Sequence, residues 1–302
     1  MKIAITGSTG LIGSALVEAL AGAGHAITRV TRRRGAAGEG AAVVWQPERG
    51  EIDAAGLEGH DAVIHLAGEP VVGWWTARKK ARIRASRARG TRLLSETLAR
   101  LTRPPRVLVS ASATGFYGNR PPEEPLDESS APGIGFLAGV ALEWERATAE
   151  AEAAGIRVVH ARFGLVLSPK GGALAAMLPV FRLGLGGRLG SGRQVWSWIT
   201  LDDVVAAVAH VLAAERVAGP VNFVSPNPVT NAEFTRVLAR VLGRPAIFAV
   251  PAPAARLLLG EMADEMLLAG ARVVPRKLLD SGYRFLHPEL EAALRSILRR
   301  GA

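Results

Sequence analysis

The chain has 302 residues, of which 49% are hydrophobic and 21% are charged. This composition is typical of a globular protein with a substantial core. Cysteine is absent from the sequence, which excludes disulfides, thiolate chemistry and cysteine-ligated zinc. The six histidines show no metal-ligand spacing, so we expect no metal.

The formal net charge of +10 raises the question of a nucleic-acid partner. The densest basic segment is 78–89, and on a helix its cations would scatter around most of the circumference, without aromatic side chains to stack on bases. We therefore predict no nucleic-acid partner. No apolar run reaches the roughly 18 residues that a membrane helix needs, and Met1 and Lys2 lead straight into a strand without a signal-peptide pattern. The expected location is cytoplasmic, with no membrane partner.

The first expected elements are a strand at 2–6 and a helix at 11–22, joined by a glycine-rich turn. Three glycines at fixed spacing permit a tight turn, and a helix N-terminus behind the turn offers N–H groups to a pyrophosphate. We therefore predict a dinucleotide site here. Its expected residues are Gly7, Thr9, Gly10, Leu11, Ile12 and Gly13. The alternative is an ordinary strand-to-helix turn.

The second strand is expected at 26–31, with its end close to the glycine turn. An NAD site carries Asp or Glu about 20 residues after the glycines, where it binds the ribose 2′-hydroxyl. This chain has Thr31 and Arg32 there, with Arg33 and Arg34 behind them. Because guanidinium groups bind phosphate bidentately, we predict that the cofactor is NADP. The alternative is a cluster of solvated arginines that do not contact the cofactor, and Arg34 is the arginine for which this is expected first.

Strands and helices continue to alternate up to about residue 165. The expected strands are 42–45, 62–66, 106–111 and 156–161, the expected helices are 76–101 and 136–154, and loops are expected at 35–41 and 119–135. This alternation predicts an α/β fold, namely a Rossmann-type doubly wound parallel sheet with its ligand at the carboxyl ends of the strands.

Beyond residue 165 the pattern changes. A glycine-rich stretch at 184–192 is followed by an expected helix at 202–214, a strand at 221–224, a helix at 231–242 and a proline-punctuated tail. We predict a dinucleotide-binding domain at 1–165, to which 195–224 returns. A second, smaller C-terminal substrate domain would comprise 166–194 and 225–302.

Three motifs follow the first, fourth and fifth strands: T-G-S-T-G-L-I-G at 6–13, H-L-A-G at 65–68 and S-A-S-A-T-G-F-Y-G at 110–118. Together they resemble the extended short-chain dehydrogenases/reductases, whose best-known members are nucleotide-sugar epimerases. Segments 75–87, 181–203 and 274–290 are similar to an atypical epimerase-like family that carries a small C-terminal domain of unknown function. The resemblance covers essentially the whole chain.

The resemblance implies a role for each matching residue. It assigns the three glycines to the pyrophosphate and Arg32 to the 2′-phosphate, and it places Gln46 at the adenine edge. It also brings Leu66, Ala67 and Gly68, after the fourth strand, beneath the ribose and nicotinamide. The next residue, Glu69, is expected to contact a polar group there. His65 has an equally good structural interpretation, and Asp202 and Asp203 are expected to cap the helix that follows them.

The catalytic residues of the superfamily are only partly present. Ser112 lies where the resemblance places the catalytic serine, but the Tyr-x-x-x-Lys pair is replaced by Phe136 and Val140. In the superfamily the Lys lowers the tyrosine pKa and the Tyr exchanges a proton with the substrate oxygen. The chain has only two tyrosines, Tyr117 and Tyr283, so the pair is not misaligned.

Two functions therefore remain open. The first is an NADP-dependent, epimerase-like oxidoreductase of unknown substrate, in which Ser112 is assisted by Tyr117 from the same loop. The second is an NADP(H)-binding pseudoenzyme or redox-sensing interaction protein. Tyr117 has a structural interpretation as well, as an aromatic residue in a turn.

The substrate side is expected in the segment after residue 180. Arg182 and Arg193, with Trp196 and Trp198, suggest a small-molecule substrate that is anionic or nucleotide-linked. Core packing is the alternative for the tryptophans. Because the helix expected at 76–101 is so basic, two copies would repel each other, so we predict a monomer or a weak homodimer.

Overall fold

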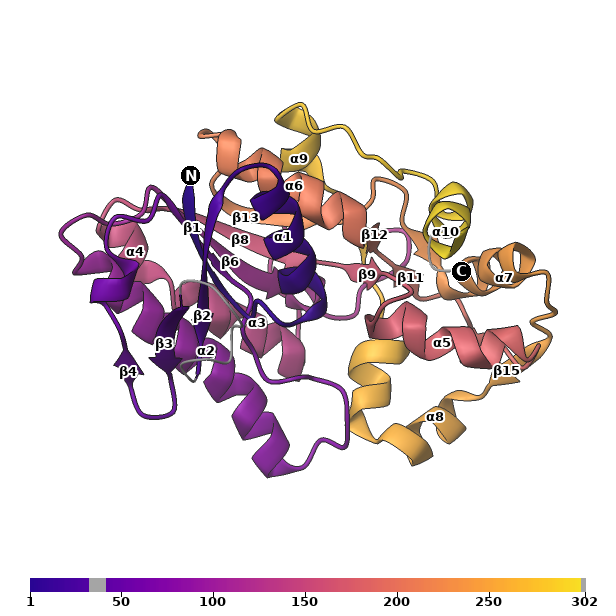
Figure 1. Ribbon diagram of the computed structural model, residues 1–302. Coiled ribbons are helices and arrows are strands. Elements are labelled where there is room, and N and C mark those ends of the chain that lie inside the picture. Colours follow the sequence, from indigo (N-terminus) through magenta and orange to yellow (C-terminus); the bar gives the residue numbers. More distant parts are fainter. Residues whose placement is uncertain (33–41, 300–302) are drawn as a thin grey trace.

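The structure is a computed structural model that describes residues 1–32 and 42–299. Its centre is a parallel sheet with the strand order β13-β8-β6-β5-β1-β2-β3-β4, in which only β4 is antiparallel to its neighbour. The strands of this sheet are β1 (Lys2–Thr6), β2 (Ala26–Thr31), β3 (Ala42–Gln46), β4 (Glu51–Ile52), β5 (Ala62–His65), β6 (Val107–Ala113), β8 (Arg157–Phe163) and β13 (Gly219–Phe223). The doubly wound parallel sheet is therefore confirmed (Figure 1).

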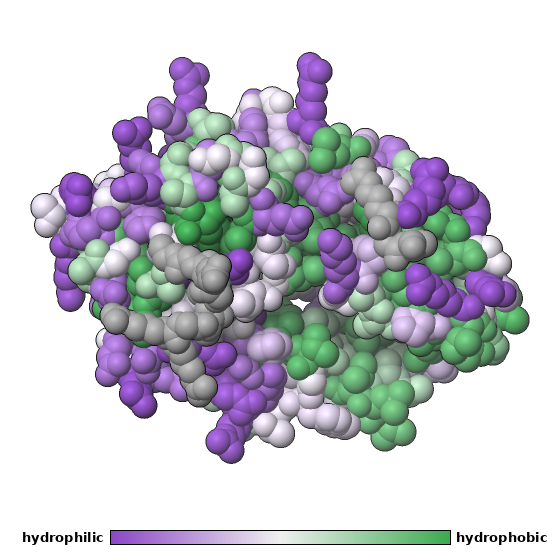
Figure 2. Space-filling model, in the orientation of Figure 1, coloured by the Kyte–Doolittle hydropathy of each residue, from purple (hydrophilic) through white to green (hydrophobic). Residues whose placement is uncertain are grey.

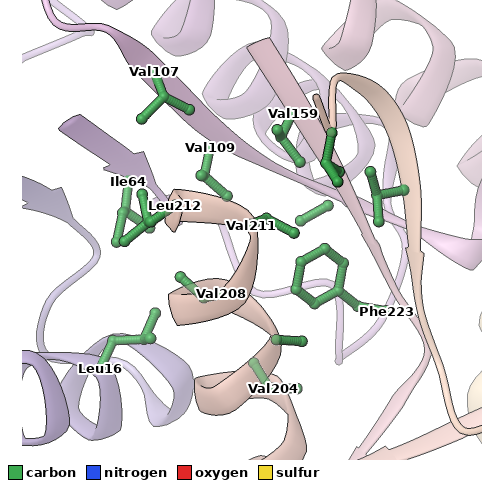
Figure 3. Packing of buried hydrophobic residues seen from close by; sticks show 14 of the residues in the cluster. Leu16, Ile64, Val107, Val109, Val159, Val204, Val208, Val211, Leu212 and Phe223 are labelled. Carbon is green, nitrogen blue, oxygen red and sulfur yellow. The ribbon is translucent and has the colours of Figure 1, made fainter. Parts of the chain in front are cut away.

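Helices cover both faces of this sheet because the strands are apolar on both sides. On one face, α1 (Leu11–Gly22) and α6 (Leu201–Ala213) share a core with Ile3, Ile5 and Ile64. Figure 3 shows Val208, Val211 and Leu212 of α6 among the strand side chains of the same cluster, which include Ile64, Val109 and Phe223. On the other face, Ala4 and Val63 share a core with α2 (Ala77–Ala99) and α4 (Ala149–Ala153).

The helix predicted at 136–154 is in fact two helices, α3 (Phe136–Arg146) and α4. Thr148 lies between them, and its hydroxyl donates to the carbonyl of Glu145 at 2.8 Å. A hydroxyl bond of this kind competes with the helical backbone bonds, which explains the break. The loop predicted at 119–135 contains the short strand β7 (Pro125–Leu126).

The C-terminal part contains more regular structure than the sequence indicates. One helix, α5 (Gly172–Arg182), had not been predicted, and the proline-rich tail contains α8 (Ala252–Leu259), a π-helical turn (Ala263–Leu267), α9 (Arg276–Asp280) and α10 (Leu290–Arg299). The predicted helix at 231–242 is confirmed as α7 (Asn231–Leu242). A separate core cluster joins side chains of α5, α7 and α10.

Short strands connect the two parts. They are β9 (Leu165–Leu167), β10 (Gly187–Leu189), β11 (Val195–Trp196), β12 (Trp198–Thr200), β14 (Val229–Thr230), β15 (Phe248–Val250) and β16 (Arg272–Val273). They pair as β9 with β12, β10 with β15, β11 with β14 and β7 with β16. Strand β13 lies in the main sheet, while Leu278 of α9 and Tyr283 pack into the core beneath it.

In the described residues, no helix combines the length and the apolar character needed to cross a membrane.

Candidate functional site

The candidate cofactor residues gather at the carboxyl-terminal ends of neighbouring strands of the main sheet. In the parallel register Thr6 of β1 lies between Val30 of β2 and His65 of β5, and His65 lies beside Ser110 of β6. The glycine turn, Arg32 and the segment after β5 therefore follow neighbouring strand ends, and Ser112 is the penultimate residue of β6. Gln46 ends β3, the next strand outward. Doubly wound sheets bind their ligands at these carboxyl-terminal strand ends.

The glycine turn has a shape that larger residues would not permit. Gly7 has φ +66°, and a Cβ at Gly13 would lie 2.1 Å from the Gly7 carbonyl oxygen. Gly10 is the N-cap of α1, has no side chain to cap the helix, and is followed by a first turn without acidic residues. The first N–H groups of the helix, from Leu11 to Gly13, thus have no helical acceptor and remain available to an anion.

A buried histidine fixes this turn to the segment after β5. The Thr6 hydroxyl accepts hydrogen bonds from the N–H groups of Leu66 (3.0 Å) and Ala67 (3.2 Å). With its lone pairs occupied, it donates its own proton to His65 Nδ1 at 2.7 Å. His65 Nε2 then carries the ring proton and donates to Thr91 Oγ1 of α2 at 2.9 Å. Burial lowers the pKa of His65 to about 4, so the ring is neutral and structural.

The residues expected near the adenosine end lie at the ends of β2 and β3. Thr31 is half-buried and Arg32 is exposed, while Arg33 and Arg34 lie outside the described residues. A second arginine, Arg29, was missed by the sequence argument. Its guanidinium donates to the Ser8 carbonyl of the glycine turn at 3.3 Å, which adds a positive charge at the phosphate side.

The segment after β5 is held by α2. Arg87 donates to the Glu69 carbonyl at 2.9 Å and lies over the Trp144 ring, and a Cβ at Gly68 would lie 3.3 Å from its guanidinium carbon. The Glu69 carboxylate was expected to meet a polar group of the cofactor. In the structure it accepts a hydrogen bond from Lys79 at 2.8 Å, which lowers the pKa of the carboxyl.

Ser112 belongs to a buried ionic network that the sequence argument did not find. Its hydroxyl donates to Glu145 Oε1 at 2.7 Å. The same carboxylate pairs bidentately with Arg162, through Nε and Nη2, both at 2.8 Å. The side chains of Arg162 and Glu145 are only 4% and 10% exposed. The Ser112 hydroxyl is therefore hydrogen-bonded to a charged group inside the protein.

Tyr117 lies at the other end of this network, in a 3-10 turn (Thr114–Tyr117). Its hydroxyl receives a hydrogen bond from Arg162 at 2.9 Å and shares its proton between Asn222 Oδ1 (2.7 Å) and the Asp127 carbonyl (3.0 Å). The side chain is fully buried, and burial raises its pKa to about 12. This geometry gives no support to the predicted acid–base role and favours the structural interpretation of Tyr117.

Phe136 and Val140, which replace the usual pair, lie on α3. Val140 is buried, whereas Phe136 packs edge-on against Trp75, with Lys80 Nζ 4.6 Å from its ring centroid. These aromatic rings line a groove of about 740 Å³ together with Lys80, Arg84 and Glu261. Figure 2 shows a hollow at the centre of the molecule, between the part that contains α2 and the part that contains α8.

A carboxylate from the C-terminal part caps α3. Glu265 accepts hydrogen bonds from the backbone N–H groups of Phe136 (3.0 Å) and Leu137 (3.1 Å). The N-cap residue of α3 is Gly135, which has no side chain for this purpose. Glu265 therefore joins the π-helical turn to the helix that would carry the usual catalytic pair.

The residues predicted for the substrate side do not form one site. Arg182 and Arg193 are exposed, Trp196 packs against Phe234, and Trp198 is fully buried with its indole N–H on the Asn227 carbonyl. The core interpretation of Trp198 is therefore confirmed. The cap of α6 is the Thr200 hydroxyl rather than Asp202 or Asp203. Instead, the buried Asp203 carboxylate accepts from Tyr283 and from the backbone of residues 286–287.

Comparison with known proteins now assigns the family. Residues 3–224 match the NAD dependent epimerase/dehydratase family, and residues 250–297 match a domain of unknown function (DUF1731). The chain belongs to the NAD dependent epimerase/dehydratase family. It is 45% identical over 293 residues to epimerase family protein MT2273 of Mycobacterium tuberculosis, covering 97% of this chain and 96% of the relative.

Two solved structures of epimerase proteins share the fold. The crystal structure of human epimerase family protein SDR39U1 with NADPH matches with a TM-score of 0.88 at 34% identity, covering 99% of both chains. A nucleoside-diphosphate sugar epimerase from Corynebacterium glutamicum matches with a TM-score of 0.80 at 35% identity, covering 99% of this chain and 58% of that one. The predicted resemblance to epimerase-like short-chain dehydrogenases/reductases is confirmed.

Proposed function

We propose that this epimerase-family protein binds NADP(H) and uses it in an oxidoreductase or epimerase-like reaction on a small anionic molecule. The observation that carries the proposal is the uncapped start of α1 behind the three-glycine turn, with Arg32 and no carboxylate directly after β2. The NADPH in the human relative supports the same choice of cofactor. When bound, the nicotinamide would supply or accept a hydride.

The residues present fit such a cofactor. The turn needs glycine at position 13 because a Cβ there would collide with the Gly7 carbonyl, and the same compactness lets a pyrophosphate approach the backbone N–H groups. Arg32 would hold the 2′-phosphate, with Thr31 beside it. The segment Leu66–Gly68, fixed by Thr6 and His65, would support the ribose and nicotinamide.

The groove beside Phe136 is the proposed substrate site. The groove is lined by two cations, Lys80 and Arg84, and by one carboxylate, Glu261, which favours an anionic ligand. Arg84 also pairs with Glu143, outside the groove, at 3.2 Å. Trp75 and Phe136 offer ring surfaces on which an apolar or planar part of the ligand can pack. Lys80 already pairs with Glu261 at 2.7 Å, so a bound anion would compete for this ammonium group.

One observation favours a second candidate function. Both hydroxyls predicted to carry acid–base chemistry are engaged by buried partners, and Phe136 and Val140 offer no ionisable group. A protein with an intact cofactor cradle and no proton donor would act as an NADP(H)-binding pseudoenzyme or a redox-sensing interaction protein.

A two-stage experiment separates the candidates. NADPH and NADH are titrated into the purified protein, and NADPH consumption is then followed with carbonyl compounds that differ only in a carboxylate or phosphate group. The oxidoreductase proposal expects turnover of the anionic members, with a raised KM and an unchanged NADPH Kd in Lys80→Met and Arg84→Met. The matched control is Arg89→Met, an exposed arginine of α2 that does not line the groove. Tight NADPH binding without turnover would favour the second function.

A further inference from the structure

A second cavity, of about 300 Å³, lies between α7 and β15, toward the right-hand edge of the molecule in Figure 1. We call it the arginine cavity, because Arg188, Arg236, Arg240 and Arg244 line it together with Phe248. It is formed by different elements from the glycine turn and from the groove beside Phe136, so the proposed function does not use it.

The local structure gathers these cations on one surface. Arg236 and Arg240 are four residues apart and therefore lie on one exposed face of α7. Gly243 ends the helix in the left-handed conformation (φ +64°), which turns the chain back and places Arg244 at the same end. Arg188 comes from β10, which pairs with β15 through Arg188 and Ala249.

The charges of the cavity are only partly compensated. Arg240 donates to Glu291 at 2.9 Å, and Glu291 is shared with Arg295. Arg188 Nη1 donates to the carbonyls of Gly190 and Ser191, both at 3.0 Å, which orients its guanidinium and leaves its other N–H groups available. Within residues 42–299, the exposed side chains of Arg236 and Arg244 form no hydrogen bond or ion pair. Of the four guanidinium groups in this described part of the chain, Arg240 alone has a carboxylate partner.

An apolar surface adjoins the arginines. Ile247 is 82% exposed and Phe248 is 49% exposed, although both are large apolar residues. A planar ring beside a set of guanidinium groups matches a ligand that carries phosphates at one end and an aromatic ring at the other. The volume is at the lower end of the range for small-molecule sites, which suits a ligand of nucleotide size bound in part at the surface.

We infer that the arginine cavity binds a nucleoside diphosphate, with its phosphates on Arg188, Arg236, Arg240 and Arg244 and its base against Phe248. The diphosphate supplies two to three negative charges, which match the excess of cations over Glu291.

The test must keep the cofactor site occupied, because a glycine turn of this kind also binds diphosphates. The protein is saturated with NADPH and then titrated with ADP by calorimetry at physiological ionic strength. The expected result is one further equivalent of ADP. The Arg236→Gln/Arg244→Gln variant should weaken this second binding at least tenfold and leave NADPH binding unchanged. The matched control is Arg284→Gln, an exposed arginine outside the cavity, which should bind ADP as the wild type does.

Two further arms separate the parts of the ligand. The Phe248→Ala substitution should weaken ADP binding severalfold. The same variant should bind inorganic pyrophosphate with the affinity of the wild type. Absence of a second equivalent would overturn the inference, as would ADP binding that excess NADPH displaces or that the arginine substitutions leave unchanged. Binding of a single-stranded oligonucleotide without binding of ADP would assign the cations to a nucleic acid instead.

Discussion

Arg162 donates a hydrogen bond to the Tyr117 hydroxyl and places its guanidinium 3.5 Å from the centroid of the Phe116 ring. The same guanidinium forms the bidentate pair with Glu145, which in turn accepts from Ser112. The hydroxyls of Ser112 and Tyr117 are thus linked through one buried ion pair. The buried electrostatic network therefore fixes the positions of both hydroxyls.

Replacing Tyr117 should therefore affect folding more than binding. Tyr117→Phe leaves an Arg162 N–H and Asn222 Oδ1 without their partner, which should lower the free energy of unfolding by about 1–3 kcal/mol. NADPH affinity should not change. Urea unfolding and NADPH titration measure the two quantities. Unchanged stability with complete loss of turnover would restore the acid–base interpretation.

Removal of one partner of the buried ion pair should cost more. Arg162→Met leaves the Glu145 carboxylate buried without its counter-ion, and such changes lower stability by about 3–5 kcal/mol. The double variant Arg162→Met/Glu145→Leu should recover part of this loss because neither charge remains. The matched control is Arg84→Met, whose partner Glu143 is 43% exposed and whose loss should change the unfolding midpoint little. Equal effects of the two single variants would contradict the argument.

His65 predicts a pH dependence of stability. The unfolded chain binds a proton at this residue below pH 6.5, whereas the folded chain does so only below about pH 4. Since the unfolded state then holds more protons, stability falls as the pH drops through this window, by about 3 kcal/mol in total. His65→Gln should be less stable at neutral pH and show a shallower pH slope in urea unfolding. Burial also lowers the pKa of His160. Because both proteins contain His160, the difference between their pH slopes reports on His65 alone. Parallel slopes would disprove the assignment.

Arg32 predicts the choice of cofactor. The Arg32→Ala substitution should weaken NADPH binding by about tenfold or more, because a charge-assisted phosphate contact is lost. NADH affinity should stay the same, since NADH has no 2′-phosphate. Fluorescence titration of both nucleotides measures the effect, with the exposed Arg216→Ala as the control. A wild-type protein that binds both nucleotides equally would exclude NADP specificity.

Glu265 predicts a stability link between the C-terminal part and α3. Glu265→Ala leaves the N–H groups of Phe136 and Leu137 uncapped, a loss of about 0.5–2 kcal/mol for a typical cap. Hydrogen exchange should increase at the start of α3 and not in α6, whose cap is Thr200. Glu261→Ala, which removes a more exposed carboxylate of the same segment, should leave exchange in α3 unchanged.

The parts of the fold that depend on local patterns could be predicted from the sequence. The strand pattern at 2–6 and the glycine spacing at 7–13 are local signals that identify the first strand, the turn and the helix that follows, before their contacts with β2 and β5 are known. Helix α5 was missed because Pro179 lies within it, Gly171 precedes it and Gly172 begins it, all features that usually oppose a helix. It forms because Leu174, Leu178 and Phe181 are buried in the core shared with α7 and α10.

The candidate site was harder to predict because its chemistry depends on residues distant in the chain. The fate of the Tyr117 hydroxyl is decided by Arg162 and Asn222, which are 45 and 105 residues away in sequence. One signal was present: Arg162 is a charged residue directly after the strand expected at 156–161. A charge in a buried strand requires a partner. The preceding helix expected at 136–154 offers four carboxylates, and the sequence does not show that Glu145 is the one that pairs with Arg162.

The packing of the C-terminal segment around β13 has a consequence for synthesis of the chain. Strand β13 is an edge of the main sheet, and its neighbours include Lys277, which donates to the Ala218 carbonyl, and Val274, which accepts from Asn222. These residues emerge from the ribosome more than fifty positions after the strand. Until then the edge strand lacks this covering, and an uncovered edge strand can pair with another nascent chain. We therefore expect truncation after residue 250 to yield an aggregating product, and chaperone demand during translation to fall only once residues 274–283 are available.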